Sequence, residues 1–553
     1  TLGADVANSV RQTYFPLTSP VGASTNGRAR QAERSLSNLN FQSLLTWAPD
    51  FGSDNELEVL GGYEFTRFDN RGFEAEMRGF LTDAFQWNNL GAGTSEGSPA
   101  PISYIEQSKL ASFFARVNYG FKNRYFVTGV LRNDGSSRLA PGNKWAVFPA
   151  ISASWRLSEE SFLKDGMFSN LNLRVGYGLQ GNQAVRPYGT QLLLRTNNDA
   201  RYPFGGSVIT GFAASQVANP DLKWETSQQI NVGLDYGFKD NQFTGTLEFY
   251  KKKTKDLLFD VPVAQPAVVS TRLENVGSLS TSGFEASLDA QLFSNSNSSL
   301  TSGLVLSVER NQVDELGLNR QFITTASVNG QGQSGKSAQR LIPGQPIGTF
   351  WGAEFAGYNA NGEQLFNKYT VTRDATGKDI GRTRNGTTTS PGGDDEVIIG
   401  NANPAFSLGV RSNGTWGRFD ASWLWRAEMG RDVFNNTALV YGTTSNVNQS
   451  RNFLKSALNA KDAIGQPAIY SSRWIEDGSF LRLQNLTVGY TFRLPGLSAR
   501  DTRVYVSGDN LLLFTPYSGY DPEVYSGFGT DRGIDYLIYP RARTFTSGVR
   551  IQF

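Results

Sequence analysis

The last eleven residues of the chain, Arg543-Thr-Phe-Thr-Ser-Gly-Val-Arg-Ile-Gln-Phe553, alternate between two kinds of side chain. Successive side chains of a β-strand point to opposite faces of the sheet, so every second residue shares a face. One face of this segment would carry Phe545, Ser547, Val549, Ile551 and Phe553 and would be mostly apolar. The other face would be polar. One such strand fits a half-buried soluble sheet, whereas a transmembrane β-barrel repeats the pattern in nearly every strand.

The same alternation recurs along the whole chain, with clear examples at 57–65, 113–121, 171–177, 230–238, 284–292 and 486–492. We predict about fifteen such strands, many near the ~10 residues that a tilted membrane strand needs. Charged residues of these segments fall on the polar face: Arg116, Arg174, Asp235, Glu248, Glu285, Asp289 and Arg550. Aromatic residues crowd the strand ends, where interfacial girdles would lie: Tyr63, Phe65, Tyr119, Phe121, Tyr236, Phe238, Tyr490, Phe492 and Phe553.

The predicted connections alternate in length. Short ones lie at 122–124, 239–242, 293–299 and 413–415, and Asn413-Gly414 is a strong hairpin signal. Long ones lie near 66–109, 181–225, 311–403, 427–478 and 512–542. Short turns on one side and long loops on the other are typical of an antiparallel transmembrane β-barrel with periplasmic turns and extracellular loops.

Composition excludes several other classes. The 553 residues are 39% hydrophobic with a mean hydropathy of −0.36, and no stretch approaches the ~20 apolar residues of a spanning helix. The chain has neither cysteine nor histidine, which excludes disulfides, thiol chemistry and imidazole-based metal sites or catalysis. A formal net charge of +2 gives no indication of a nucleic-acid partner.

Two other architectures remain open on this pattern: a passive porin, or another structural or secretion component of the outer membrane, and a secreted adhesin built from several β-sandwiches. Repetition of equivalent outer faces favours one membrane annulus over several sandwiches. The opening residues from Thr1 show no signal peptide and are interpreted as polar loop, so the chain is expected to lack its natural N-terminus.

Several segments resemble motifs of SusC-like (SusC/RagA) TonB-dependent outer-membrane transporters. Arg132-Asn-Asp-Gly-Ser-Ser-Arg138, with Trp145 and Phe148-Pro149, resembles that family's "RxDGSSRF…W…FPS". Further matches, in the family's order, are Leu173–Gly178 with Gly181-Asn182, Asn219–Glu225, Asn275–Gly277 with Gly283–Glu285, Pro343–Gly352, Ile399–Asn401 with Asn403-Pro404, and Gly519–Glu523. Ile342 and Pro343 depart from the family pattern at its first positions.

The resemblance implies a fold and a function. It implies that residues 1–553 are the C-terminal part of one 22-stranded barrel, with the plug domain and the first strands absent from this chain. It implies active import of an oligosaccharide or peptide across the bacterial outer membrane, under a SusD-like lipoprotein lid and with energy from TonB. Phe553 would be the terminal signal for barrel assembly. No enzymatic activity and no catalytic residue are implied.

Loop aromatics are the candidate substrate-binding residues. Phe350, Trp351 and Tyr358 lie in the connection 311–403, and Tyr517, Tyr520 and Asp521 lie in the last long connection. Aromatic rings on external loops can stack on sugars or hold peptide side chains. The alternative is packing within the loops.

Polar clusters give weaker candidates. Asn359, Asn361 and Glu363, and the run Asp394-Asp395-Glu396, are rich in the oxygen ligands that calcium prefers, but no complete calcium-loop motif is present. We therefore predict solvated loop charge and no metal or other cofactor. Arg132, Asp134 and Arg138 would end a strand at the outer rim, as a structural network or as substrate contacts.

Overall fold

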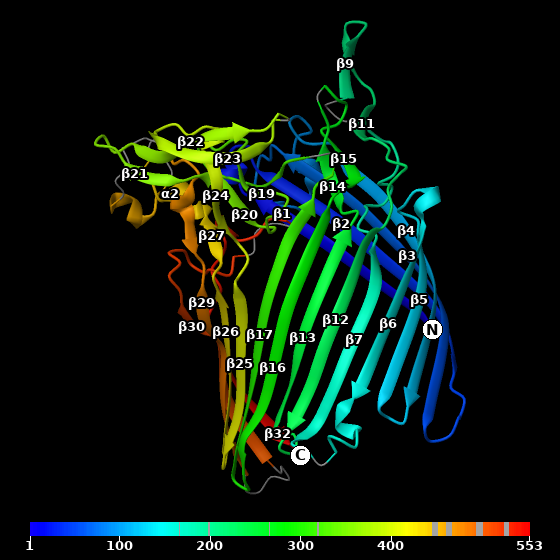
Figure 1. The fold of residues 1–553 in the computed structure, drawn as a ribbon. Helices are drawn as coiled ribbons and strands as arrows, with labels where there is room; N and C mark the ends of the chain where they lie inside the picture. Colours follow the sequence, from blue (N-terminus) through cyan, green and yellow to red (C-terminus); the bar gives the residue numbers. More distant parts are fainter. Residues whose placement is uncertain are drawn as a thin grey trace. The chain divides into compact units, whose positions relative to one another are not determined.

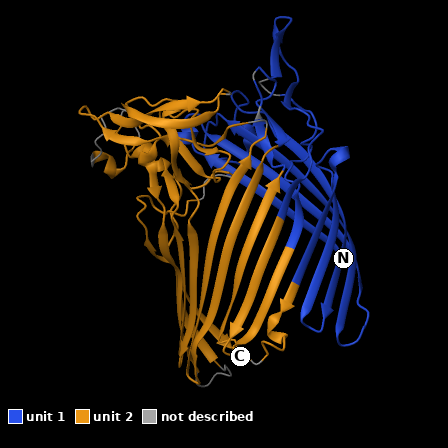
Figure 2. Ribbon diagram, viewed as in Figure 1, with its two compact units in different colours: residues 1–153, 177–228, 256–275 blue, residues 154–176, 229–255, 276–553 orange. Residues whose placement is uncertain are grey.

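The computed structural model describes residues 1–164, 166–196, 200–264, 266–317, 320–375, 377–444, 452–459, 467–493, 501–524 and 530–552. The chain divides into two compact units (Figure 2). Unit 1 comprises Thr1–Ala153, Tyr177–Gln228 and Asp256–Asn275, and unit 2 comprises Ser154–Gly176, Gln229–Lys255 and Val276–Phe553. Each unit is described by itself below.

The elements are almost all strands (Figure 1). The long strands are β1 (Leu2–Phe15), β2 (Arg28–Trp47), β3 (Asn55–Arg78), β4 (Ile102–Phe121), β5 (Tyr125–Ser136), β6 (Trp145–Arg156), β7 (Phe168–Asn182), β12 (Glu225–Phe238), β13 (Phe243–Lys255), β16 (Ser278–Ser294), β17 (Ser298–Glu315), β25 (Phe406–Trp416), β26 (Phe419–Met429), β29 (Phe480–Phe492), β30 (Asp501–Phe514) and β32 (Thr544–Gln552).

Shorter strands and two helices lie in the connections. They are α1 (Pro20–Ala23), β8 (Leu193–Arg195), β9 (Arg201–Phe204), β10 (Ser207–Thr210), β11 (Ala213–Gln216), β14 (Leu258–Pro262), β15 (Thr271–Asn275), β18 (Ile323–Ser327), β19 (Ser337–Leu341), β20 (Thr349–Ala353), β21 (Phe355–Tyr358), β22 (Gln364–Arg373), β23 (Asp379–Thr388), β24 (Glu396–Asn401), β27 (Asp432–Asn435), α2 (Asn436–Tyr441), β28 (Ile475–Asp477) and β31 (Ile534–Asp535). No helix in the described ranges is long and apolar enough to cross a membrane.

Within unit 1 the long strands pair in the order β1-β2-β3-β4-β5, and within unit 2 in the order β13-β16-β17-β25-β26-β29-β30-β32. Within unit 1 the pairs from β1 to β5 are antiparallel, and within unit 2 the pairs from β13 to β32 are antiparallel. Figure 1 shows β13, β16 and β17 as long neighbouring strands of unit 2. The predicted all-β fold, dominated by a large antiparallel sheet, is confirmed.

In unit 2 the sheet has two chemically different faces. Phe249, Phe284 and Val308 stand directly opposite one another on β13, β16 and β17. Phe249 is 51% exposed and Phe284 is 40% exposed, although both are large apolar side chains. On β32 the apolar members of the terminal alternation, Phe545, Val549 and Ile551, are exposed as well. A continuous exposed apolar face of this kind indicates a surface that contacts lipid or protein rather than water.

The polar face of unit 2 carries ion pairs, and some of them span an intervening strand. Asp289 on β16 and Arg411 on β25 lie on either side of Gly303 on β17, and Arg411 Nη2 is 2.8 Å from Asp289 Oδ1. Asp420 on β26 and Arg503 on β30 meet over Gly489 on β29, where Arg503 Nε donates to Asp420 Oδ1 at 2.9 Å. Glycine has no side chain there, so the two charged groups can reach each other.

The strands extend further than the alternation predicts. β3 has 24 residues and ends at Arg78, and β4 begins only at Ile102, so the connection predicted near 66–109 is much shorter. The outer ends of these strands carry polar and charged residues on both faces. Their apolar periodicity is lost there, but their backbone pairing continues from Phe65 opposite Ala111 to Glu74 opposite Ile102.

The predicted hairpin between the strands at 406–410 and 419–425 is confirmed, but its predicted turn at Asn413-Gly414 is wrong. Both residues lie inside β25, paired with Thr301 and Leu300 of β17, and the turn lies at Gly417-Arg418. Gly417 has φ = 61°, a conformation that glycine adopts at no steric cost, so it can begin the two-residue turn. Gly414 has a packing role instead, because a Cβ at this position would lie 2.2 Å from the Trp416 ring.

The interpretation of the opening residues as loop is also wrong. Leu2–Phe15 forms β1, which pairs with β2 along its whole length, from Leu2 opposite Phe41 to Phe15 opposite Arg28. Its apolar face includes Leu2, Val6 and Val10, all of them exposed. Small and polar residues between these three obscured the alternation.

We predict that Gly489→Val destabilises the protein by about 1–3 kcal/mol, the usual cost of overpacking. A Cβ at Gly489 would lie 2.5 Å from atoms of both Arg503 and Asp420, so the new side chain must separate the ion pair. Gly409→Val on β25 is the matched control, because no atom lies within 4 Å of the corresponding Cβ. The readout is the temperature at which the heat-modifiable gel band of the folded protein converts to the unfolded form. Equal shifts for the two variants would contradict the prediction.

Candidate functional site

Three long connections of unit 2, residues 316–405, 430–479 and 515–543, form what we call the loop assembly. The first contributes a four-stranded sheet in the order β18-β19-β20-β24 and a three-stranded sheet in the order β21-β22-β23. The other two meet in a sheet in the order β28-β27-β31. Because β31 belongs to the last connection and β27 and β28 to the second, segments far apart in sequence are tied together by backbone hydrogen bonds.

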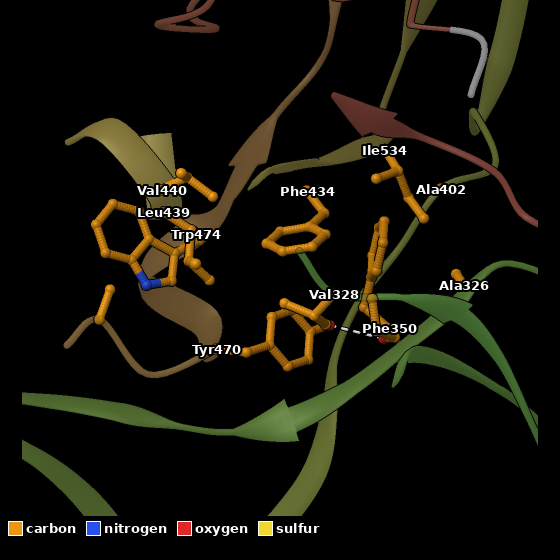
Figure 3. Close-up of a cluster of buried hydrophobic side chains, with 12 residues drawn as sticks. Ala326, Val328, Phe350, Ala402, Phe434, Leu439, Val440, Tyr470, Trp474 and Ile534 are labelled. Atoms are coloured by element: carbon orange, nitrogen blue, oxygen red, sulfur yellow. Dashed lines mark hydrogen bonds between the residues drawn. The ribbon is translucent and has the colours of Figure 1, made fainter. Parts of the chain in front are cut away.

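The loop assembly has a hydrophobic core of its own, to which all three connections contribute (Figure 3). Phe350 and Phe434 are fully buried, and the Phe434 ring meets the Tyr470 ring edge-on with centroids 4.8 Å apart. The Tyr470 hydroxyl donates to the Ala338 carbonyl at 2.7 Å, and burial raises the pKa of Tyr470 well above its ordinary value. A packed core of this kind holds the loop surfaces in fixed positions.

Phe350 and Trp351 are consecutive residues of β20, and they lie in different surroundings. Phe350 belongs to the loop core, so its ring offers no surface to a ligand in this conformation. Trp351 points into a stack of cations and rings. The Arg340 guanidinium carbon is 4.6 Å from the Trp351 ring and 4.2 Å from the Phe322 ring, and that of Arg382 is 5.3 Å from Trp351. Such cation–π contacts fix the orientation of the guanidinium groups.

This stack lines a pocket of about 870 Å³ in unit 2. Its lining residues are Arg320, Gln321, Phe322, Arg340, Ile342, Pro343, Trp351, Lys378, Asp379, Gly381 and Arg382. They come from the residues before β18, from β19 and the two residues after it, from β20, and from β23 with the residue before it. We call it the cationic pocket, because four of the lining residues are basic and one is acidic.

Carboxylates partner two of the pocket's cations. Arg340 Nη2 lies 2.7 Å from Glu396 Oε2, and Arg382 Nη2 lies 2.6 Å from Asp379 Oδ2. Burial lowers the pKa of Arg340, and Glu396 opposes that change. Among the described residues no carboxylate lies within 4.0 Å of the charged groups of Arg320 or Lys378. The pocket therefore keeps an excess of positive charge.

Tyr358 lies apart from the cationic pocket, at the end of β21. Its ring meets the Phe355 ring edge-on at 5.3 Å, and the Arg473 guanidinium carbon is 5.5 Å from its centroid. Tyr358 is half-buried, so part of its ring surface remains accessible.

The three candidates of the last connection differ in exposure. Tyr517 is buried with Val433 and Val524 and donates to Asp535 Oδ2 at 2.7 Å; burial, assisted by that carboxylate, raises the pKa of its hydroxyl. Tyr520 is 74% exposed. Asp521 is buried and accepts a hydrogen bond from Arg482 Nη2 at 2.6 Å. Of the three, only Tyr520 presents its side chain to a ligand.

Arg482, which sequence reasoning did not single out, anchors this connection to β29. Its side chain is 1% exposed, and its guanidinium lies 2.6 Å from an Asp521 oxygen and 2.9 Å from a Glu523 oxygen. Arg541 reaches Glu523 at 3.2 Å from the other end of the connection. A buried arginine between two carboxylates fixes the segment that carries Tyr520.

The oxygen-rich segments have protein partners. The Asn359 side chain accepts from the amides of Asn361 and Glu363 at 3.0 and 2.9 Å, which closes a tight turn. Asp395 accepts from the amides of Gly392 and Tyr369. Asp394 pairs with Arg373, and Glu396 pairs with Arg340. The described ranges contain no cluster of three or more acidic side chains placed to hold a metal.

The rim candidates of unit 1 form an internal network. Arg132 Nε lies 2.7 Å from Asp134 Oδ1, and Arg132 Nη2 reaches Glu64 at 3.1 Å and Ser112 at 2.8 Å. Arg138 donates to Ser108 and to the Val185 carbonyl. These contacts support the structural alternative. The remaining candidate, Phe553, lies outside the described residues.

Sequence reasoning singled out Trp351 but none of the cations around it. Arg320, Arg340 and the pair Lys378 and Arg382 stand in three separate segments, and only the tertiary packing of these segments brings the four cations to one pocket. Basic residues are no denser in 316–405 than in the rest of the chain, so composition gives no signal of which of them share a pocket.

Comparison with known proteins places these features in a family. Residues 3–511 match the family model described as TonB dependent receptor-like, beta-barrel. The chain is 31% identical to TonB-dependent receptor P3 of Formosa agariphila, over 100% of this chain and 56% of that protein. It is 29% identical to TonB-dependent receptor SusC of Bacteroides thetaiotaomicron, over 93% of this chain and 50% of that protein. The chain thus spans about half the length of these curated relatives.

Solved structures show the same fold. The RagAB peptide importer in its 'closed-closed' state matches with a TM-score of 0.83 at 24% identity, over 100% of this chain and 59% of that chain. A structure of the RagAB peptide transporter matches with a TM-score of 0.82 at 23% identity, with the same coverage.

We predict that Arg482→Met destabilises the loop assembly by about 3 kcal/mol, because it removes the buried cation between Asp521 and Glu523 and leaves these carboxylates only the more exposed Arg426 and Arg541. Arg493→Met is the control, since Arg493 is 84% exposed and its partner Asp501 is 3.5 Å away. Limited proteolysis should cut the Arg482 variant within residues 515–543 much faster than the parent and leave the Arg493 variant unchanged. Unchanged protection of that segment in the Arg482 variant would refute the anchoring role.

Proposed function

The chain belongs to the TonB dependent receptor-like β-barrel family of the outer membrane, and on that premise we propose that it serves in a SusC-like transporter for active nutrient import. The cargo is an oligosaccharide or peptide too large for passive pores. The partner is a SusD-like surface lipoprotein that acts as a lid, and TonB supplies the energy. Transport makes and breaks no covalent bond, so this function requires no catalytic residue.

The observation that carries the proposal is the division of the sheet into two faces within a family-matched chain. Large apolar side chains such as Phe249 and Phe545 are exposed, as contact with lipid requires. Charged residues such as Asp289 and Arg411 are paired on the opposite face. A polar face suits the passage of a hydrated solute, because it replaces hydrogen bonds that the solute makes with water.

The loop assembly supports the choice of a large ligand. Its own core gives it a stable surface, and Trp351, Tyr358 and Tyr520 are the candidate residues that keep accessible aromatic surface or pocket contact. RagAB, whose fold this chain shares, is described as a peptide importer, which keeps peptides among the proposed cargoes.

Energised uptake is the decisive test. We expect cells that express the complete protein with its lid partner to accumulate a labelled oligosaccharide or peptide, and we expect deletion of TonB to abolish this accumulation. A passive porin would continue to conduct without TonB, so uptake that is unaffected by the deletion would overturn the proposal.

We predict that Tyr520→Ala weakens ligand binding by the lid-bound complex about tenfold, the usual effect of removing an aromatic contact worth ~1.4 kcal/mol. Tyr539→Ala is the matched control, because Tyr539 is an exposed tyrosine of the same connection and is not a candidate. Isothermal titration of the purified complex provides the measurement. Equal losses for the two variants would show that Tyr520 makes no specific contact.

A further inference from the structure

The cationic pocket has more hydrogen-bond donors than the protein itself uses. Its walls carry the guanidinium groups of Arg320, Arg340 and Arg382 and the ammonium group of Lys378, and their acidic counterpart in the lining is Asp379. Glu396, which is not a lining residue, forms an ion pair with Arg340, and Asp379 forms one with Arg382. Subtracting these two pairs leaves Arg320 and Lys378, so the pocket holds two positive charges that no described carboxylate balances.

Two buried donors point to the same shortage of acceptors. Arg320 Nη1 and Trp351 Nε1 are both shielded from solvent, and neither has a hydrogen-bond partner among the described residues. A buried donor without a partner costs roughly 1–3 kcal/mol, so these two atoms show that the walls around the pocket lack acceptors. Both residues line the pocket, which places the unmet demand at one location.

The guanidinium groups are held ready for an anion. The Arg340 guanidinium contacts both the Phe322 ring and the Trp351 ring. The Arg382 guanidinium also lies over the Trp351 ring. A planar guanidinium whose orientation is fixed by stacking binds carboxylate or sulfate oxygens through two parallel N–H donors with little loss of conformational entropy. The volume of about 870 Å³ falls within the ~300–1,000 Å³ range of small-molecule sites.

We propose that the cationic pocket binds the carboxylate or sulfate groups of an acidic oligosaccharide. The inference rests on the proposed import function and narrows its cargo. An acidic sugar is rich in acceptors, which the donor-rich walls require, and its hydroxyl groups can both donate and accept. A peptide carries one amide donor for each carbonyl acceptor, and the pocket offers few acceptors for those amides. Phe322, Ile342 and Pro343 supply apolar surface for the faces of the sugar rings.

The test compares ligands that differ in charge alone. The complete protein, purified in detergent, is titrated calorimetrically with tetragalacturonate and with its methyl ester, and with a sulfated galactan tetramer and its desulfated counterpart. A tetraglutamate peptide forms the third arm. We expect at least one acidic sugar to bind and its neutral counterpart to bind far more weakly, and the two sugar arms distinguish carboxylate from sulfate. Equal binding of acidic and neutral sugars, or binding of tetraglutamate alone, would overturn the assignment.

The variants locate the site. Arg320→Gln and Lys378→Gln each remove a positive charge without breaking an ion pair among the described residues, and each should weaken the acidic sugar about fivefold. Lys368→Gln is the matched control: Lys368 is exposed on β22, in the same sheet as β23, and does not line the pocket. Addition of salt should weaken the parent more steeply than the Lys378 variant. An equal loss for Lys368→Gln would overturn the assignment.

Failure of the pocket assignment and failure of the transport proposal are distinguishable. Binding to the purified protein requires no TonB, so acidic-sugar binding without TonB-dependent uptake supports the pocket and rejects the transport function. TonB-dependent uptake that is unchanged in the Arg320→Gln, Lys378→Gln double variant, together with unchanged binding, rejects the pocket and leaves the transport function in place.

Discussion

The architecture of unit 2 depends on one constraint: charged side chains and large apolar side chains lie on opposite faces of a single sheet. The long strands present large apolar side chains on one face, so a charged residue level with them lies on the other face, where it needs a partner. Asp289 with Arg411 and Asp420 with Arg503 meet this need across an intervening strand, and Gly303 and Gly489 leave the space for it. Register, glycine placement and charge pairing are therefore set together, because a shift of one residue would move every charge to the apolar face.

The loop assembly solves a different problem. Long connections normally run over a surface and are mobile, yet a binding site requires fixed groups. Here three connections bury Phe350, Phe434 and Tyr470 in a common core, and Arg482 ties the last connection to β29 through Asp521 and Glu523. The hydrophobic core supplies cohesion, and the buried ion pairs supply position. The exposed side chains of the assembly, Tyr520 among them, are thereby held on a rigid support.

Trp351 joins the core to the cationic pocket. Its neighbour Phe350 is fixed in the core, so the backbone of β20 is fixed and the indole is presented on the opposite face. The indole then orients Arg340 and Arg382 by stacking, while Glu396 and Asp379 neutralise those two guanidinium groups. The charge that remains for a ligand comes from Arg320 and Lys378, which have no such partners among the described residues. Different side chains of the pocket therefore fix the orientation of the guanidinium groups and supply the unpaired positive charge for a ligand.

The sequence by itself determined the fold class, since side-chain alternation is a local property of a strand and survives in segments such as 230–238 and 543–553. It also determined the family through an ordered series of short motifs. Tertiary structure decided features that the local sequence pattern cannot predict. Asn413-Gly414 lies inside a strand because Gly414 accommodates the Trp416 ring. Residues 2–15 pair with β2 although their alternation is weak. Tertiary structure also decided that Phe350 and Tyr517 are buried while Tyr520 is exposed, and that four cations from three segments line one pocket with Trp351. Burial and charge clustering depend on contacts between residues distant in the chain, and no periodicity within one segment encodes them.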